Sequence, residues 1–142
     1  MTPEQLDAVA RSVVAVRANA DRFSRTFYER MFTRLPDARA LFPEDLAEQR
    51  GKLVNELAFL AEAAQDMPAF VERARELGAR HRRYGVRPAD YPVVAEALFE
   101  AFAAVLGPDF DNDLAAAWRR LYSLIAETML EGAAGSTFAG QH

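Results

Sequence analysis

One histidine has the type and the position to do chemistry. His81 lies in a basic stretch, yet Leu77 and Ala74 precede it by four and seven residues, so at helical spacing its imidazole continues an apolar stripe. A histidine in such a place is more often a hydrogen-bonded core residue than a ligand. A neutral imidazole at the end of an apolar stripe is nonetheless what a metal in a dry pocket requires. The spacing alone leaves both interpretations open.

Little else in the chain offers reactivity of its own. The 142 residues include no cysteine, which excludes disulfides, thiolate zinc sites, iron–sulfur clusters and cysteine nucleophiles. The sequence has no glycine-rich phosphate loop, no HExxH motif and no Gly-x-Ser-x-Gly motif. Its carboxylates fall mostly at helical positions typical of a solvated face. We therefore expect the protein either to bind a partner or to take its chemistry from a cofactor.

The elements that must position His81 are all predicted to be helices. Hydrophobic residues recur with the period of a helix along almost the whole chain, and Thr2-Pro3-Glu4-Gln5 is typical of a capping box. We expect one all-α domain over residues 1–131, followed by a frayed tail, 132–142, rich in glycine, alanine and serine. The expected helices are 3–18, 20–34, a short turn at 37–42, 44–65, 67–83, 88–106 and 113–131.

The overall charge and hydropathy exclude two classes of partner. A formal charge of −4 and a pI near 5.2 argue against nucleic-acid binding. No apolar run approaches the roughly 20 residues needed to cross a bilayer, and Met1–Asp7 lacks the features of a secretory signal. We therefore expect a cytoplasmic protein with no membrane contact.

Several short motifs stand in a recognisable order along the chain. They are His81-Arg82-Arg83-Tyr84-Gly85-Val86, Tyr91-Pro92-Val93-Val94, Phe27-Tyr28, Pro36, Leu41-Phe42, and Trp118 with Tyr122. Taken together they resemble the haem domain of bacterial globins, over about residues 3–131, and most of all single-domain haemoglobins and the haem domain of flavohaemoglobins. The resemblance implies a globin fold with helices packed around haem b.

The resemblance assigns a role to individual residues. His81 matches the proximal histidine that binds the haem iron. Tyr28 and Gln49 match the distal residues that face a bound gas, and Gln49 and Leu53 lie four residues apart on one helical face. From the residues alone, Tyr28 could equally be an ordinary core tyrosine and Gln49 a surface residue. The cofactor-binding residues that the resemblance implies are Phe42, Leu53, Leu77, Val86, Tyr91, Val94, and, for the propionates, Lys52 and Arg80.

One position departs from the flavohaemoglobin pattern. In that family a glutamate late in the last helix joins the proximal histidine and its flanking tyrosine, here Tyr91, in a hydrogen-bonded set. Counting from Trp118 and Tyr122, the matching residue is Ala133, and Glu131 lies about 200° away around a helix. A carboxylate there would make the imidazole a stronger electron donor to iron. Without this carboxylate, we do not expect strong electronic activation of the iron.

Taken with the residues, the resemblance predicts reversible binding of O2, and of NO or CO, at a five-coordinate iron. It also implies nitric oxide detoxification, for which this chain, ending before any flavin domain, would need a separate reductase. Two alternatives remain open. The protein could be a gas or redox sensor that acts through a protein partner, or a cofactor-free helical interaction module. The sequence does not choose between monomer and homodimer.

Overall fold

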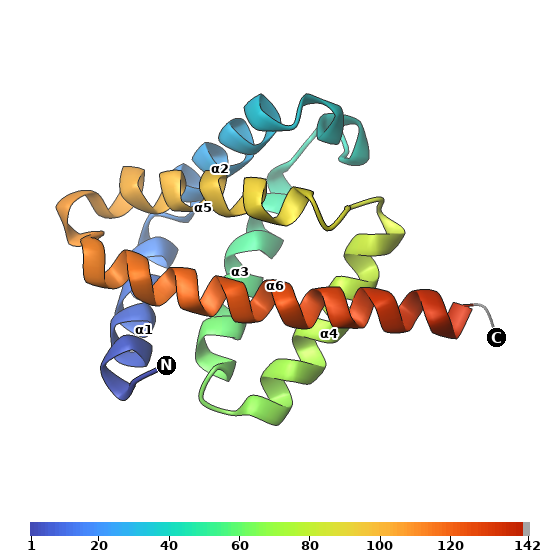
Figure 1. Ribbon diagram of the computed structural model, residues 1–142. Coiled ribbons are helices and arrows are strands. Elements are labelled where there is room, and N and C mark those ends of the chain that lie inside the picture. The colour runs from blue at the N-terminus through green and yellow to red at the C-terminus, as the bar shows by residue number, and fades with distance from the viewer. Residues whose placement is uncertain (141–142) are drawn as a thin grey trace.

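The computed structural model describes the backbone of residues 1–140 and the side chains of residues 1–134. Over those residues every regular element is a helix, which confirms the all-α prediction (Figure 1). In chain order the elements are α1 (Pro3–Ala18), α2 (Ala20–Arg34), the 3-10 helix η1 (Pro36–Leu41), α3 (Ala47–Ala63), α4 (Met67–Arg83), α5 (Asp90–Leu106), the 3-10 helix η2 (Gly107–Asp109) and α6 (Asn112–Gly140).

Most helix ends follow from local chemistry that the sequence shows. The capping box is confirmed: the Thr2 hydroxyl accepts from the Gln5 amide at 3.1 Å, and the Gln5 side chain accepts from the Thr2 amide at 2.9 Å. α3 starts three residues later than expected, because the Asp45 carboxylate accepts from the Ala47 amide and closes a turn before it. α5 likewise begins at Asp90, whose carboxylate accepts from the Arg87 amide.

The last helix is longer than expected. α6 continues to Gly140, past residue 131, where we expected the helix to end. Ala133 and Ala134 favour the helix, and no proline interrupts it. The domain boundary at residue 131 and the frayed tail stay predictions, and residues 141–142 lie outside the described residues.

The core is centred on aromatic residues of α2, α5 and α6. Phe23, Phe102 and Trp118 are at most 1% exposed, and the rings of Phe102 and Trp118 lie 4.5 Å apart. The buried indole of Trp118 donates to the Ser12 hydroxyl of α1 at 2.8 Å, which satisfies both polar groups. This side of the molecule is therefore a filled core.

α4 and α6 approach backbone to backbone at two glycines. A Cβ built on Gly78 of α4 would lie 1.9 Å from the carbonyl oxygen of Met129, and one built on Gly132 of α6 would lie 2.0 Å from that of Arg75. Only glycine permits backbones to approach so closely. The crossing fixes α4 against α6 three residues before His81.

α3 and α4 form a V that is closed at the turn joining Ala63 to Met67 and open at the other end (Figure 1). The start of α3, which carries Gln49, and the end of α4, which carries His81, lie at this open end. The fold thus places these two predicted site residues on facing helices.

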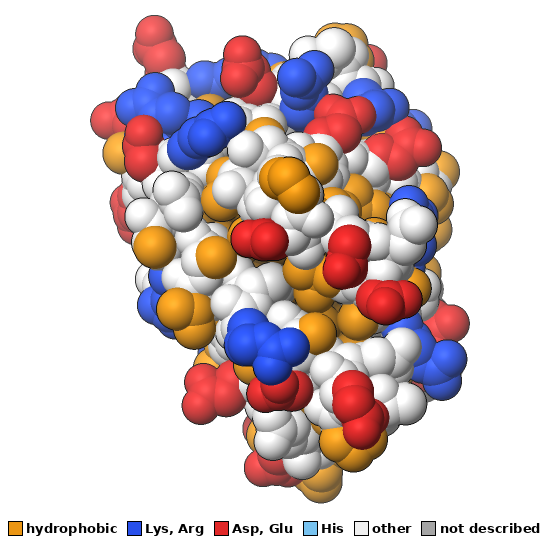
Figure 2. All heavy atoms as spheres, turned by 90° about the vertical axis from the view of Figure 1, so that its left-hand side faces the viewer, with side chains coloured by type: hydrophobic (Ala, Val, Ile, Leu, Met, Phe, Trp, Pro, Cys, Tyr) orange, Lys and Arg blue, Asp and Glu red, His pale blue; other side chains and the backbone are white. Residues whose placement is uncertain are grey.

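Two observations bear on the expected environment of the chain. Among the described residues one segment, Asp90–Asp109, is long and apolar enough to cross a membrane, which corrects the expectation that no apolar run approaches that length. It includes α5, of which Ala97, Ala101 and Phe102 are at most 1% exposed, although only 28% of the apolar window is buried. On the face in Figure 2, acidic and basic side chains are interspersed.

Candidate functional site

His81 is held in the tautomer that a metal ligand needs. Its Nδ1 lies 2.8 Å from the carbonyl oxygen of Leu77, one helical turn earlier. A carbonyl only accepts, so Nδ1 carries the proton and Nε2 keeps its lone pair. Burial lowers the pKa of His81, although the Leu77 bond opposes this, so the ring is neutral at neutral pH. The Leu77 carbonyl is therefore the partner of the ring N–H.

A metal at His81 must take its remaining ligands from a cofactor. Within the described part of the chain, no group of three or more histidine, cysteine, aspartate or glutamate side chains converges. One imidazole does not hold a metal ion by itself. The donor set therefore fits an iron whose other ligands belong to a porphyrin.

Tyr28 of α2 is buried, and its hydroxyl makes only a long hydrogen bond. The residue is 5% exposed, and its hydroxyl lies 3.5 Å from the backbone oxygen of Gln49 on α3. Hydroxyl donors usually lie 2.5–3.0 Å from their acceptors, so this proton remains available to a better one. Phe42 packs edge-on against the Tyr28 ring, with centroids 5.6 Å apart. The structure thus brings Tyr28, Gln49 and Phe42 together.

We expect Tyr28 to stay protonated far into the alkaline range. Burial raises its pKa from 10.0 to about 12, partly opposed by a hydrogen bond with the Gln49 side chain. The folded chain holds this proton more tightly than the unfolded chain, so the stability linked to it is complete below pH 10 and is lost between pH 10 and 12. Phenolate absorbance after a rapid pH jump should show one transition near 12 that Tyr28→Phe lacks. If Tyr28→Phe instead lacks a transition near pH 10, the phenol of Tyr28 is solvated in the parent protein.

The apolar residues assigned to the cofactor share one property. All are half-buried, whereas the core residues of α5 and α6 are almost completely buried. Half-buried apolar side chains leave apolar surface that an apolar ligand can cover. These residues are Phe42 after η1, Leu53 of α3, Leu77 of α4, Val86 in the α4–α5 turn and Val94 of α5.

The position of the missing glutamate adjoins Tyr91. Ala133 of α6, Tyr91 of α5 and Val86 line one cavity of about 280 Å³. Tyr91 is 8% exposed, and its backbone oxygen accepts from the Tyr122 hydroxyl at 2.6 Å. The structure thus places Ala133 beside the tyrosine that the sequence count paired it with.

The two candidate propionate-binding residues have different surroundings. Lys52 is exposed, lies 3.5 Å from Glu48, and lines an open hollow of about 410 Å³ together with Gln49. Arg80, in contrast, is partly buried: its Nε and Nη2 atoms are buried and make no hydrogen bond. Buried N–H groups without an acceptor are costly, so Arg80 is the stronger candidate for an anionic ligand.

Sequence reasoning missed two residues beside Arg80. Glu56 of α3 lies 3.7 Å from the Arg80 guanidinium and accepts two hydrogen bonds from Arg73 of α4, at 2.9 and 3.0 Å. A signal was present, because Glu56 follows Gln49 and Leu53 at the spacing of one helical face.

Comparisons with known proteins find a family match over most of the chain. The family model described as Globin matches residues 25–129. The flavohemoprotein of Deinococcus radiodurans is 34% identical over 134 residues, and that of Halalkalibacterium halodurans is 27% identical over 134 residues. Each match covers 92% of this chain and 33% of the relative, so the chain spans about a third of their length.

A solved structure resembles the whole chain. It is described as an engineered carbene transferase and putative nitric oxide dioxygenase from Rhodothermus marinus. The TM-score is 0.87 at 29% sequence identity, and the match covers 100% of this chain and 99% of the other. The arrangement of the six α-helices is therefore one already seen in a protein of this length.

Proposed function

This chain belongs to the globin family, and on that premise we propose that it holds haem b between α3 and α4 and binds dioxygen reversibly. The observation that carries the proposal is the tautomer of His81, whose unprotonated Nε2 is available to iron because Nδ1 is engaged by Leu77. When bound, haem supplies an iron with an open coordination position for O2, NO or CO.

The residues assigned to the cofactor fit haem. Phe42, Leu53 and Leu77 offer half-buried apolar surface to a flat macrocycle, and the unpartnered N–H groups of Arg80 offer donors to a propionate. Their burial also keeps water from the iron. The test is to add hemin to the haem-free chain and record the Soret band, whose absence would support the cofactor-free alternative.

On the distal side Tyr28 is proposed to act as a hydrogen-bond donor to the bound gas. Its weak contact with Gln49 at 3.5 Å leaves the proton free to turn, and its raised pKa keeps the donor protonated. Dioxygen becomes strongly polarised at ferrous haem and gains more from such a donor than carbon monoxide does. Oxygen release is therefore proposed to be slow.

Replacing Tyr28 with phenylalanine is expected to speed oxygen release. The change removes one donor to a polarised ligand, a bond whose loss corresponds to about 10- to 100-fold in rate. Stopped-flow mixing of the oxygenated protein with carbon monoxide measures it. Tyr84→Phe, at a residue that is 63% exposed, is the matched control and should release oxygen at the parent rate. Equal rates in all three proteins would rule out the distal role of Tyr28.

A second candidate function is nitric oxide dioxygenation. It is favoured by the likeness to a putative nitric oxide dioxygenase along the whole chain, at 29% identity. The overall reaction takes one nitric oxide, one dioxygen and one electron to one nitrate, so turnover needs a reductase of the flavin-containing class. Nitrate formed beyond one equivalent only when such a reductase is added would identify the chain as an enzyme.

A further inference from the structure

An ion-pair cluster between α3 and α4 has one filled and one unfilled guanidinium edge. The Nε and Nη2 of Arg73 donate to the two carboxylate oxygens of Glu56 at 2.9 and 3.0 Å. The same two atoms of Arg80 are buried and make no hydrogen bond, and its Nη2 lies 3.7 Å from a Glu56 oxygen, which is an ion-pair contact only. This edge of a guanidinium is shaped to bind a second, planar carboxylate.

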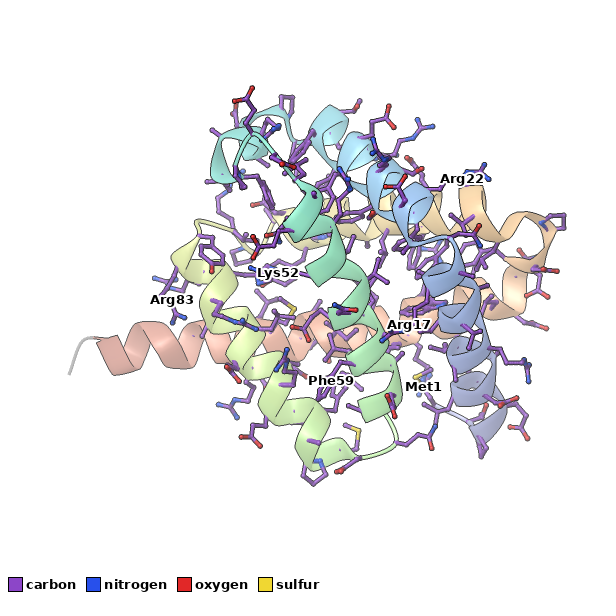
Figure 3. The ribbon with its side chains drawn as sticks, turned by 180° about the vertical axis from the view of Figure 1, so that it is seen from behind. Met1, Arg17, Arg22, Lys52, Phe59 and Arg83 are labelled. Atoms are coloured by element: carbon purple, nitrogen blue, oxygen red, sulfur yellow. The ribbon has the colours of Figure 1, made fainter. Side chains whose placement is uncertain are left out.

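The cluster is anchored from the Arg73 side. The Arg73 guanidinium lies 5.0 Å from the ring centroid of Phe59, one turn beyond Glu56 on α3. Figure 3 shows Phe59 on the side of α3 that is next to α4. Phe59 is 44% exposed, so the stacking gives this apolar residue a structural role. Arg73 thereby fixes Glu56 through both carboxylate oxygens, and one of them, Oε1, also faces Arg80.

We propose that Glu56 is a positioning residue for the cofactor, which holds the Arg80 guanidinium in place so that its Nε–Nη2 edge receives a haem propionate. The inference rests on the proposed haem binding. Two arginines and one glutamate leave the cluster with a net positive charge, which suits one added carboxylate. Glu56 itself is already neutralised by the two bonds from Arg73, so it orients Arg80 without competing fully for it.

Removing the Glu56 charge should release Arg80. Arg73 and Arg80 lie seven residues apart, two turns along one face of α4, and without the carboxylate between them they repel each other. Arg80, adjacent to His81 and carrying a long flexible side chain, then turns to solvent and leaves the propionate with a weaker partner. The prediction concerns retention of haem and not the ligation of iron.

The experiment measures the rate at which haem leaves the loaded protein for an excess of a scavenging apoprotein. In Glu56→Gln the rate should rise about five-fold, the scale of a partly exposed ion pair that orients one hydrogen-bonded partner. Glu62→Gln, an exposed glutamate of the same helix, is the control and should leave the rate unchanged. Glu56→Asp keeps the charge and should fall between the two, which also covers a Gln variant that folds poorly.

Two further arms separate positioning from a general effect on structure. With haem dimethyl ester, whose propionates carry no charge, Glu56→Gln and the parent should lose the porphyrin at equal rates. In an Arg80→Gln background the Glu56 change should have no further effect. A five-fold difference that persists in either arm overturns the proposal, as does an unchanged rate with ordinary haem. If the parent chain shows no Soret band with hemin, the proposed function itself fails, so the two failures are distinguishable.

Discussion

Replacing His81 with glycine is expected to abolish the Soret band of the haem-loaded protein, and added imidazole is expected to restore it. The imidazole Nε2 is the only nitrogen of this ring left without a hydrogen, because Nδ1 donates to Leu77 at 2.8 Å. Glycine leaves a ring-sized space at the end of α4 in which free imidazole can bind iron. Optical titration of the variant with hemin, with and without imidazole, measures both effects.

The matched control for this substitution is Arg83→Ala. Arg83 lies in the same last turn of α4, is exposed, and points away from α3 (Figure 3). Its variant should bind hemin as the parent does, with a band of the same shape. A His81→Gly protein that keeps the parent spectrum without imidazole would show that another group binds the iron, and the proposed site would have to move.

Periodicity and capping were sufficient to predict most of the fold. α2 was predicted with its observed ends, and α1 begins at the predicted capping box. Two helix starts were predicted wrongly because a side chain acts across a turn: Asp45 delays α3 and Asp90 delays α5. Such carboxylates favour turns and helix starts alike, so the sequence does not say which of the two each will form.

The sequence predicted only part of the candidate site. Spacing placed His81 and Leu77 on one face, and the observed bond between them is local, one turn of a single helix. The proximity of Tyr28 to Gln49 joins two helices, and only the family resemblance suggested it. Helical spacing places Glu56 on the face of Gln49 and Leu53, but it carries no information about the pairing of Glu56 with Arg73 and Arg80 on another helix.

The glycines of the α4–α6 crossing show the same limit. By helix propensity alone, Gly78 is a defect that costs about 1 kcal/mol relative to alanine. In the structure Gly78 is needed, because only a residue without a side chain lets α4 lie against the Met129 backbone. The end of α4 is therefore placed by a contact in which neither helix contributes a side chain.

Gly78→Ala is accordingly expected to lower the free energy of unfolding by about 3 kcal/mol or more, despite alanine's better helix propensity. The new Cβ would lie 1.9 Å from a backbone oxygen, which no rotamer change can relieve, so α4 and α6 must separate. Urea unfolding measures the loss.

Gly51→Ala is the matched control: it is also within a helix, and its Cβ meets nothing within 4 Å, so it should stabilise by about 0.5–1 kcal/mol. Equal midpoints for the two variants would mean that the crossing is loose. Because the crossing lies three residues before His81, Gly78→Ala should also speed haem loss where Gly51→Ala does not, which would connect the packing of α4 to the position of the imidazole.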